Sequence, residues 1–315
     1  MSIYISIPTL TDNQLIYTIQ DIFNNASNPK DIHVGIAFMT DESYYLNFLK
    51  KIKKYKNIKT KHFDVKTNVG VGLGRHNAAS MYDNQDYILQ IDSHTHFTKN
   101  WDSLLLKMYD QALEETKNKK TILTAYLAPF LHSSNGERIL VRKSPGYPVF
   151  QKEFWDNTTK IPRWTDYMIS DFPDSLKTNK KFIPCVKFNA NFAFGNKHFA
   201  LDNHLDKNVI FMEEEIVQTI NLLGDGFSLV FPNQTIPCYH LYDNIKENIK
   251  ESYRNSIYDL YDESKFPISI KENFNNFINN PDNFKKIKIF EKYSQVDLKN
   301  GARYSWYTPK EYNYD

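Results

Sequence analysis

The first 126 residues alternate between short apolar runs and amphipathic stretches, and this order constrains the fold more than any other feature. The apolar runs predict strands over residues 3–8, 32–38, 58–65, 87–92 and 121–126. The stretches between them predict helices over residues 11–25, 44–55, 75–82 and 101–116, the first from a capping box of Thr11 and Gln14. Strands that alternate with helices predict an α/β fold, with a mostly parallel sheet flanked by helices on both faces.

The remainder of the chain is less regular. Residues 128–184 have no clear period and predict short hairpins or an insertion that covers a substrate. Regular patterns return as a strand over 186–194, a helix over 213–223, and strands over 227–231 and 235–239. Further helices are expected over 245–261 and 270–278, before an aromatic end at 301–315. We therefore divide the chain into residues 1–243, which carry the sheet and the irregular insertion at 128–184, and a C-terminal helical and aromatic extension at 244–315.

The composition limits which partners the protein is expected to bind and in which compartment it is expected to occur. The formal net charge of the 315 residues is only +2, which argues against binding to nucleic acid without excluding a local basic patch. The two cysteines, Cys185 and Cys238, do not form a disulfide framework and are typical of a reducing compartment. The N-terminus has no basic leader, and no apolar run approaches the roughly 18 residues of a membrane span. We expect a soluble, cytoplasmic protein that does not bind membranes.

The strand predicted over residues 87–92 ends at a carboxylate, and an imidazole follows two positions later. Side chains at positions i and i+2 of an extended chain point to the same side, so Asp92 and His94 can converge on one divalent metal ion. The alternative is that Asp92 caps the next turn and His94 is a surface histidine, because a single Asp-x-His motif is weakly specific.

Other polar residues also follow predicted strands. Pro8, Thr9 and Asp12 come after the first strand, and His240 ends the last one. Ligands of open α/β sheets bind at the carboxyl ends of the strands, so these residues are candidates for the same site. One carboxylate and two imidazoles suit Mn²⁺, or alternatively Mg²⁺, with phosphate oxygens at the remaining positions.

Two further motifs have competing interpretations. The glycines at positions 70, 72 and 74 lack the spacing of a phosphate loop, and they indicate a tight turn before a helix more than a phosphate site. Arg75 follows them and is better placed to meet an anion. The acidic run Glu213, Glu214 and Glu215 opens a helix, where carboxylates are either solvated or directed toward the edge of the sheet.

Taken together, these motifs resemble a known family. The order is Pro8 with Asp12, then a glycine and Arg75 before a helix, then Tyr-Ile-Leu-Gln-Ile-Asp-Ser-His ending at His94, with Phe97 and Trp101-Asp102 after it. Asn191-Phe192-x-Phe194, the pair Glu214-Glu215 and a late Tyr-His-x-Tyr around His240 complete it. The sequence from Ile3 to Tyr242 is similar to the cytoplasmic polypeptide α-N-acetylglucosaminyltransferases that modify hydroxyproline, and more distantly to the mucin-type polypeptide N-acetylgalactosaminyltransferases.

The resemblance implies a GT-A fold, a Rossmann-like sheet that binds a nucleotide-diphospho-sugar, and a UDP-linked donor. It implies that Asp92, His94 and His240 bind Mn²⁺ and the diphosphate. Pro8, Thr9, Asp12 and Arg75 are then expected near uridine and phosphate, and Ser93, Trp101 and Asn191 also belong to the donor site. Glu214 and Glu215 match the acidic pair that faces the donor sugar or the acceptor. The family retains anomeric configuration, so neither acid need be a general base.

Some positions depart from the family. Gly74 stands where alanine is usual, His96 where arginine is frequent, and Glu213 where glycine is frequent. The segments that should bind the acceptor, 128–184 and 244–315, show no match. We therefore expect a metal-dependent glycosyltransferase that moves a GlcNAc-like sugar to a protein or glycan. The alternatives are a transferase that glycosylates modified DNA bases, a metal-dependent nucleotide-sugar hydrolase, and a carbohydrate-binding protein without turnover.

Overall fold

The structure is a computed structural model of the 315-residue chain. It describes residues 1–64, 70–132, 137–150, 161–162, 164–167, 170, 178–202, 206–211, 213–241, 268–298 and 301–302. The helix expected over 245–261 and most of the aromatic end at 301–315 lie outside the described residues.

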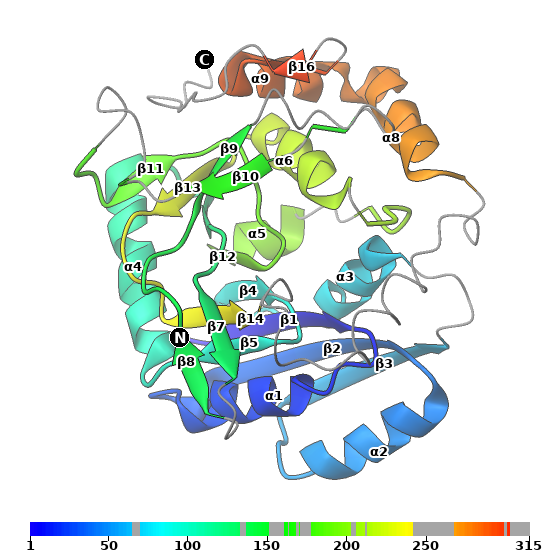
Figure 1. Ribbon diagram of the computed structural model, residues 1–315, viewed down its shortest axis with the longest axis vertical. Helices are drawn as coiled ribbons and strands as arrows, with labels where there is room; N and C mark the ends of the chain where they lie inside the picture. The colour runs from blue at the N-terminus through cyan, green and yellow to red at the C-terminus, as the bar shows by residue number, and fades with distance from the viewer. Residues whose placement is uncertain are drawn as a thin grey trace.

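The fold is built on an eight-stranded sheet in the order β11-β13-β6-β12-β4-β1-β2-β3 (Figure 1). Strands β4, β1, β2 and β3 run parallel, as does the pair β13 and β6, whereas β12 runs antiparallel between β4 and β6. Strand β11 is also antiparallel to its neighbour. The strands are β1 (Ile3–Thr9), β2 (Ile32–Thr40), β3 (Ile58–Asp64), β4 (Tyr87–Ile91), β6 (Thr121–Thr124), β11 (Phe182–Pro184), β12 (Phe192–Asn196) and β13 (Ser228–Pro232). The predicted α/β fold with a mostly parallel sheet is confirmed.

Helices cover both faces of this sheet, because its strands are apolar on both sides. One face carries α1 (Leu15–Asn24), α2 (Glu42–Ile52) and α4 (Trp101–Thr116). The other carries α3 (Val71–Ala79), α5 (Lys197–Asp202) and α6 (Glu214–Gly224) (Figure 1). A short 3-10 turn, Pro29–Asp31, precedes β2. The helix predicted over 101–116 has the bounds that the structure shows.

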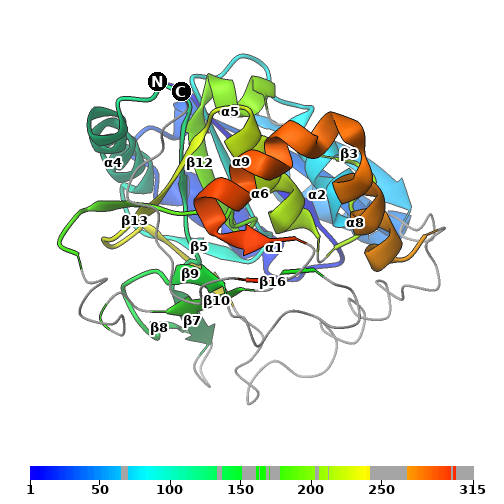
Figure 2. The same ribbon diagram turned by 90° about the horizontal axis from the view of Figure 1, so that it is seen from above.

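A second sheet of four strands lies at one end of the first, in the order β5-β14-β7-β8 (Figure 2). It joins β5 (Thr95–Phe97) and β14 (Cys238–Leu241) to the hairpin of β7 (Pro129–His132) and β8 (Arg138–Leu140). Strands β9 (Tyr147–Phe150) and β10 (Trp164–Tyr167) form a separate antiparallel pair. In its described residues, the irregular segment 128–184 thus contains short antiparallel strands, as expected.

The described part of the C-terminal segment contributes two helices, of which the second packs against α6 and the first packs against the second (Figures 1 and 2). They are α8 (Ile270–Asn279) and α9 (Phe284–Ser294), with a 3-10 turn at Pro281–Asn283 between them and a small pair, β15 (Val296–Asp297) and β16 (Gly301–Ala302), after them. Phe274 and Phe290 are fully buried in the same apolar core as the main sheet. The division at residues 243 and 244 stays a prediction. Helix α9 was not expected from the sequence.

Three expected boundaries are wrong. Helix α1 starts at Leu15 without a capping box, because the Asp12 carboxylate, and not Thr11, accepts the hydrogen bond from the Gln14 amide. Helix α3 starts at Val71, four residues before the expected start at Arg75. The strand expected over 186–194 begins only at Phe192, after a turn in which the Phe192 amide bonds the Asn189 carbonyl. Among the described residues, none of the helices is long and apolar enough to cross a membrane.

Candidate metal and donor site

Three potential metal ligands meet where the two sheets join. Asp92 follows β4, His94 lies two residues on, and His240 is on β14. One ligand atom from each lies within 4.8 Å of the other two, and the two imidazole rings are 4.5 Å apart. Pairing of β14 with β5 brings His240 to this place, because the Leu241 amide donates to the carbonyl of His94 at 3.1 Å. The expected meeting of these three side chains is therefore what the structure shows.

Asp12 orients His94. Its Oδ2 lies 2.9 Å from His94 Nδ1 and accepts a hydrogen bond from the Ser93 hydroxyl, and its Oδ1 accepts from the Gln14 amide at 2.7 Å. Burial opposes ionisation, but the hydrogen bonds and the neighbouring imidazole hold the pKa of Asp12 below its usual range. A carboxylate on one ring nitrogen fixes the ring and leaves Nε2 for a metal ion. The structure places Asp12 behind His94, one of the three predicted ligands, and the predicted place of Asp12 near uridine stays a prediction.

Arg75 joins Asp92 to the acidic run. Its guanidinium donates to Asp92 Oδ1 at 2.5 Å, to Glu214 Oε1 at 2.9 Å and to the Ile91 carbonyl at 2.9 Å. Burial opposes ionisation of Asp92, but the charge of Arg75 and the hydrogen bond from His240 lower its pKa. Burial raises the pKa of Glu214 to about 7, against the charge of Arg75. The buried guanidinium of Arg75 thus orients both Asp92, the carboxylate among the three predicted metal ligands, and Glu214 of the predicted acidic pair.

Glu215 is held by a second buried cation. Lys187 Nζ lies 2.7 Å from Glu215 Oε2 and also bonds the Tyr126 hydroxyl, while the Ala190 amide donates to Glu215 Oε1 at 3.0 Å. The Lys187 side chain is 1% exposed, whereas that of Glu215 is 25% exposed. Glu215 is thus a partly exposed carboxylate held by a buried lysine and a backbone amide.

Glu213 is part of the protein interior. It is fully buried, and its carboxylate accepts hydrogen bonds from the amides of Ile210 at 2.8 Å and Phe211 at 3.2 Å. Glu214 is 5% exposed. The solvated interpretation of the acidic run is therefore wrong for both residues, because backbone amides and Arg75 compensate their burial.

The glycine turn does not offer its amides to phosphate. The Val71 amide donates to the Ile210 carbonyl at 2.9 Å, and the Gly72 amide donates to the Val209 carbonyl at 3.1 Å. A Cβ on Gly70 would lie 2.6 Å from the Val209 carbonyl oxygen, so only glycine permits this contact. The structure favours the tight-turn interpretation.

The other residues predicted for the site lie in different parts of the fold, some at strand ends and one between helices. Asn191 precedes β12 and lies at the carboxyl end of β4, because Phe192 pairs with Ile91. Pro8 and Thr9 are buried at the end of β1. Trp101 is fully buried and donates its indole N–H to the Ile22 carbonyl at 3.0 Å, so it packs between helices and does not reach the metal group.

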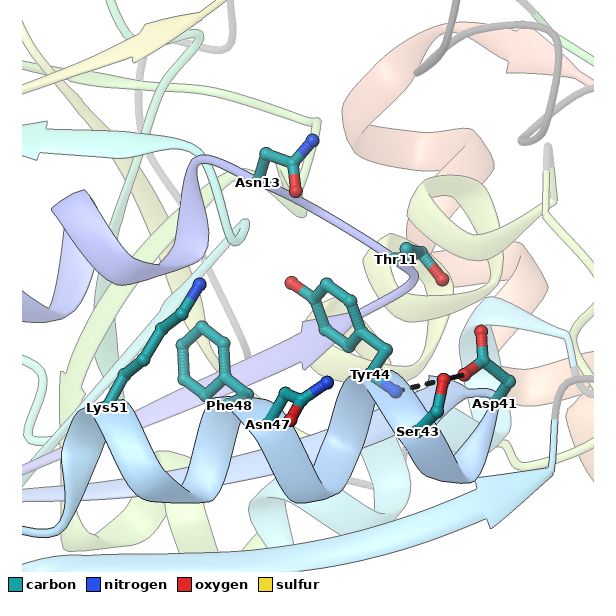
Figure 3. Close-up of a pocket in the computed structure, with 8 residues that line it drawn as sticks. All are labelled: Thr11, Asn13, Asp41, Ser43, Tyr44, Asn47, Phe48 and Lys51. Carbon is teal, nitrogen blue, oxygen red and sulfur yellow. Dashed lines mark hydrogen bonds between the residues drawn. The ribbon is translucent and has the colours of Figure 1, made fainter.

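A surface cavity of about 370 Å³ lies between the loop after β1 and helix α2 (Figure 3). Thr11 and Asn13, on either side of Asp12, line its upper side, and Tyr44 and Lys51 point toward them from α2 (Figure 3). The remaining lining residues are Asp41, Ser43, Asn47 and Phe48. The Tyr44 hydroxyl donates to the Asp12 carbonyl at 2.6 Å, which joins the cavity to the loop that orients His94.

Lys187 was missed by the sequence analysis, and only its position in the apolar stretch around residues 182–194 would have drawn attention to it. A lysine among apolar residues is almost never fully buried unless it is paired. Its pairing with Glu215, 28 residues away, has no signal in local spacing.

The eight-stranded sheet, with strand β12 antiparallel between β4 and β6, is a GT-A-type fold. A family model described as Glycosyltransferase (GlcNAc) matches residues 38–264, and the chain belongs to that family. The comparison with curated proteins found no match.

A solved structure of a glycosyltransferase supports the fold. The structure of GalNAc-T7 with UDP, GalNAc and Mn²⁺ is similar with a TM-score of 0.56 at 13% identity, covering 77% of this chain and 44% of that one. This chain thus spans less than half the length of that protein. S. aureus TarS 1–349 in complex with UDP-GlcNAc has a TM-score of 0.48 at 13% identity, covering 93% of this chain and 71% of that one.

Proposed function

We propose that this protein is a metal-dependent glycosyltransferase that moves a GlcNAc-like sugar from a UDP-sugar to a protein or glycan, with retention of anomeric configuration. The observation that carries the proposal is the convergence of Asp92, His94 and His240 at the junction of the two sheets. The specific relationship to hydroxyproline-modifying polypeptide transferases is part of the proposal, and it rests on the sequence motifs around these residues.

The donor atoms fit Mn²⁺, with Mg²⁺ as the alternative. One carboxylate oxygen and two imidazole nitrogens form a mixed set of the kind that a borderline divalent ion accepts. The hydrogen bond from Asp12 orients His94 as a ligand. When bound, the metal ion supplies Lewis-acid stabilisation of the charge on the departing diphosphate. Arg75 orients Asp92 and is the nearest fixed positive charge to it.

The cavity beside Asp12 supports a nucleotide donor. Its lining of Thr11, Asn13, Asp41 and Tyr44 offers hydrogen-bond partners and an aromatic ring to a base and ribose. We propose that uridine lies against this loop, with Pro8 and Thr9 beneath it, and that the diphosphate extends toward Asp92.

Glu214 and Glu215 have different proposed roles. Glu214 is buried against Arg75 and acts by orienting it, whereas the partly exposed Glu215 faces the donor sugar or the acceptor hydroxyl. Asn191 and Ser93 lie beside Asp92 at the carboxyl end of β4 and complete the donor side.

A thermal-shift titration tests the donor assignment. UDP with Mn²⁺ should raise the melting temperature, by linkage of about 2.7 kcal/mol when the free ligand is a hundredfold above its Kd. UDP without metal should give a smaller shift. Absence of a shift with every nucleoside diphosphate would overturn the proposal.

Turnover measurements test the metal group. Asp92→Ala and His94→Ala should each abolish Mn²⁺-dependent transfer while the protein stays folded, and His62→Ala, a histidine on β3, serves as the matched control. Full activity of the wild type in a chelator contradicts metal dependence. Release of UDP and free sugar with no labelled acceptor, across protein and glycan pools, would identify a hydrolase instead.

A further inference from the structure

One side chain of the C-terminal helix α8 reaches the loop that precedes α6. The Asn273 amide group donates to the Asn208 carbonyl at 3.1 Å and to Glu213 Oε1 at 2.9 Å. These two acceptors lie five residues apart in the second half of the loop. A single amide group therefore joins two positions of the loop to α8.

The same loop is fixed on its other side by α3. The carbonyls of Val209 and Ile210 accept from the amides of Gly72 and Val71, in a contact so close that glycine is required at position 72. Glu213 in turn accepts from the amide of Ile210. The loop is thus held between the first turn of α3 and the side chain of Asn273.

Both flanks of the loop carry a residue of the donor site. Glu214 follows Glu213 directly, and Arg75 lies one turn along α3 from Gly72. The two side chains bond each other at 2.9 Å, and Arg75 bonds Asp92 at 2.5 Å. Any movement of the loop away from α3 therefore moves Glu214 relative to Arg75.

Helix α8 is itself anchored in the core. Phe274, next to Asn273, is fully buried, and Ile270 is 7% exposed. Helix α9, which follows, bonds Asp225 at the end of α6 through Lys286 at 2.9 Å. The helix that presents Asn273 therefore has a fixed position.

We propose that Asn273 is a positioning residue for the metal and donor site, and that the C-terminal helices are the support that holds Glu214 and Arg75 against Asp92. Asn273 acts through the buried Glu213 carboxylate and does not touch donor or metal. This role rests on the proposed function, since it concerns the same metal group. It also explains why an acid is buried at position 213, because Glu213 accepts hydrogen bonds both from the loop amides and from Asn273 of α8.

The test compares Asn273→Ala and Asn273→Asp with the control Asn276→Ala, an exposed asparagine of the same helix. Mn²⁺ binding in the presence of UDP is measured directly by electron paramagnetic resonance of the full chain, together with KM for the donor and kcat. We expect Asn273→Asp to weaken Mn²⁺ binding about three- to tenfold, below the 10–100-fold typical of losing a direct partner of a metal ligand. Asn273→Ala should show a smaller effect in the same direction, and Asn276→Ala none.

A conservative variant separates positioning from general destabilisation. Asn273→Gln keeps an amide donor for Glu213 Oε1, so it should retain more of the Mn²⁺ affinity than Asn273→Asp. If the wild type binds Mn²⁺ and UDP but Asn273→Ala and Asn273→Asp bind as the Asn276→Ala control does, the positioning role is wrong and the proposed function stands. If the wild type binds neither ligand, the proposed function fails, and the positioning role fails with it.

Discussion

Replacement of Asp12 by asparagine tests whether the metal group depends on the carboxylate behind His94. In Asp12→Asn the side chain keeps its size but loses its charge, and one of its two oxygens becomes an amide NH₂ group. That group donates and cannot accept hydrogen bonds, so at the Oδ1 position it leaves the Gln14 amide without its acceptor. At the Oδ2 position the Ser93 hydroxyl can rotate to accept from it, whereas His94 Nδ1 either loses its acceptor or must transfer its proton to Nε2, the nitrogen left for a metal ion.

The size of the effect follows from this geometry. Loss of a hydrogen-bonded partner behind a metal ligand typically weakens metal binding 10–100-fold, which is about 1.4–2.7 kcal/mol. Folding stability should fall as well, by about 1–3 kcal/mol, because a buried group is left without its hydrogen bond. The Mn²⁺ affinity of the folded protein should therefore fall in addition to the free energy of unfolding.

Mn²⁺ binding to folded protein in the presence of UDP is the appropriate assay. Asp102→Asn is a matched control, because this buried acid, in the first turn of α4, accepts from the amides of Ser27 and Asn28 at 2.7 and 2.8 Å and bonds none of the three predicted ligands in these contacts. It should lose comparable stability with unchanged Mn²⁺ affinity. Equal Mn²⁺ affinity for Asp12→Asn and the wild type would refute the assignment of Asp12 to His94.

Two further substitutions and one labelling experiment have expected outcomes. Lys187→Met should lower kcat and lower the free energy of unfolding by about 1–3 kcal/mol, which is less than the ~3–5 kcal/mol of a fully buried pair because Glu215 is 25% exposed. Lys187→Arg should retain more of both, and wild-type kinetics for Lys187→Met would contradict this. Gly72→Ala should lower the melting temperature, since its Cβ would lie 2.3 Å from a backbone carbonyl oxygen, and an unchanged value in calorimetry would disprove the close contact. Cys185 and Cys238 are fully buried, and burial raises the pKa of Cys185 to about 12. A thiol reagent should therefore label neither cysteine until the protein is unfolded, and rapid labelling of the native protein would contradict this burial.

The elements that sequence predicted well are those defined by local pattern. The amphipathic helix Trp101–Thr116 and the strand before Asp92 follow from apolar periodicity. Asp92 and His94 do meet, but β4 ends at Ile91 and residues 93–94 form a turn, so the extended geometry assumed for this pair was wrong. The start of α1 was wrong because Asp12 competes with the apparent capping box and serves His94 as well. A residue of the site can thus form contacts that change where a helix starts from the position that the local sequence pattern predicts.

Contacts between distant parts of the chain had no such signal. The strand-end position made His240 a candidate and the resemblance assigned it to the metal, but the pairing of β14 with β5 that brings it there cannot be derived from either strand alone. The pairs of Lys187 with Glu215 and Asn273 with Glu213 join residues whose spacing follows no helical or strand period. These contacts depend on how the layers pack, which a single sequence does not encode in any short pattern.

The hydrogen bonds of β14 restrict where the acceptor-side segment can be exchanged between related transferases. The His240 amide donates to the Ala128 carbonyl at 3.1 Å, and His240 and Leu241 pair with Pro129 and Phe130. A chimera joined before Ala128 would remove the backbone on which an imidazole of the metal group rests. We expect donor binding to survive such an exchange only when the junction falls after Phe130.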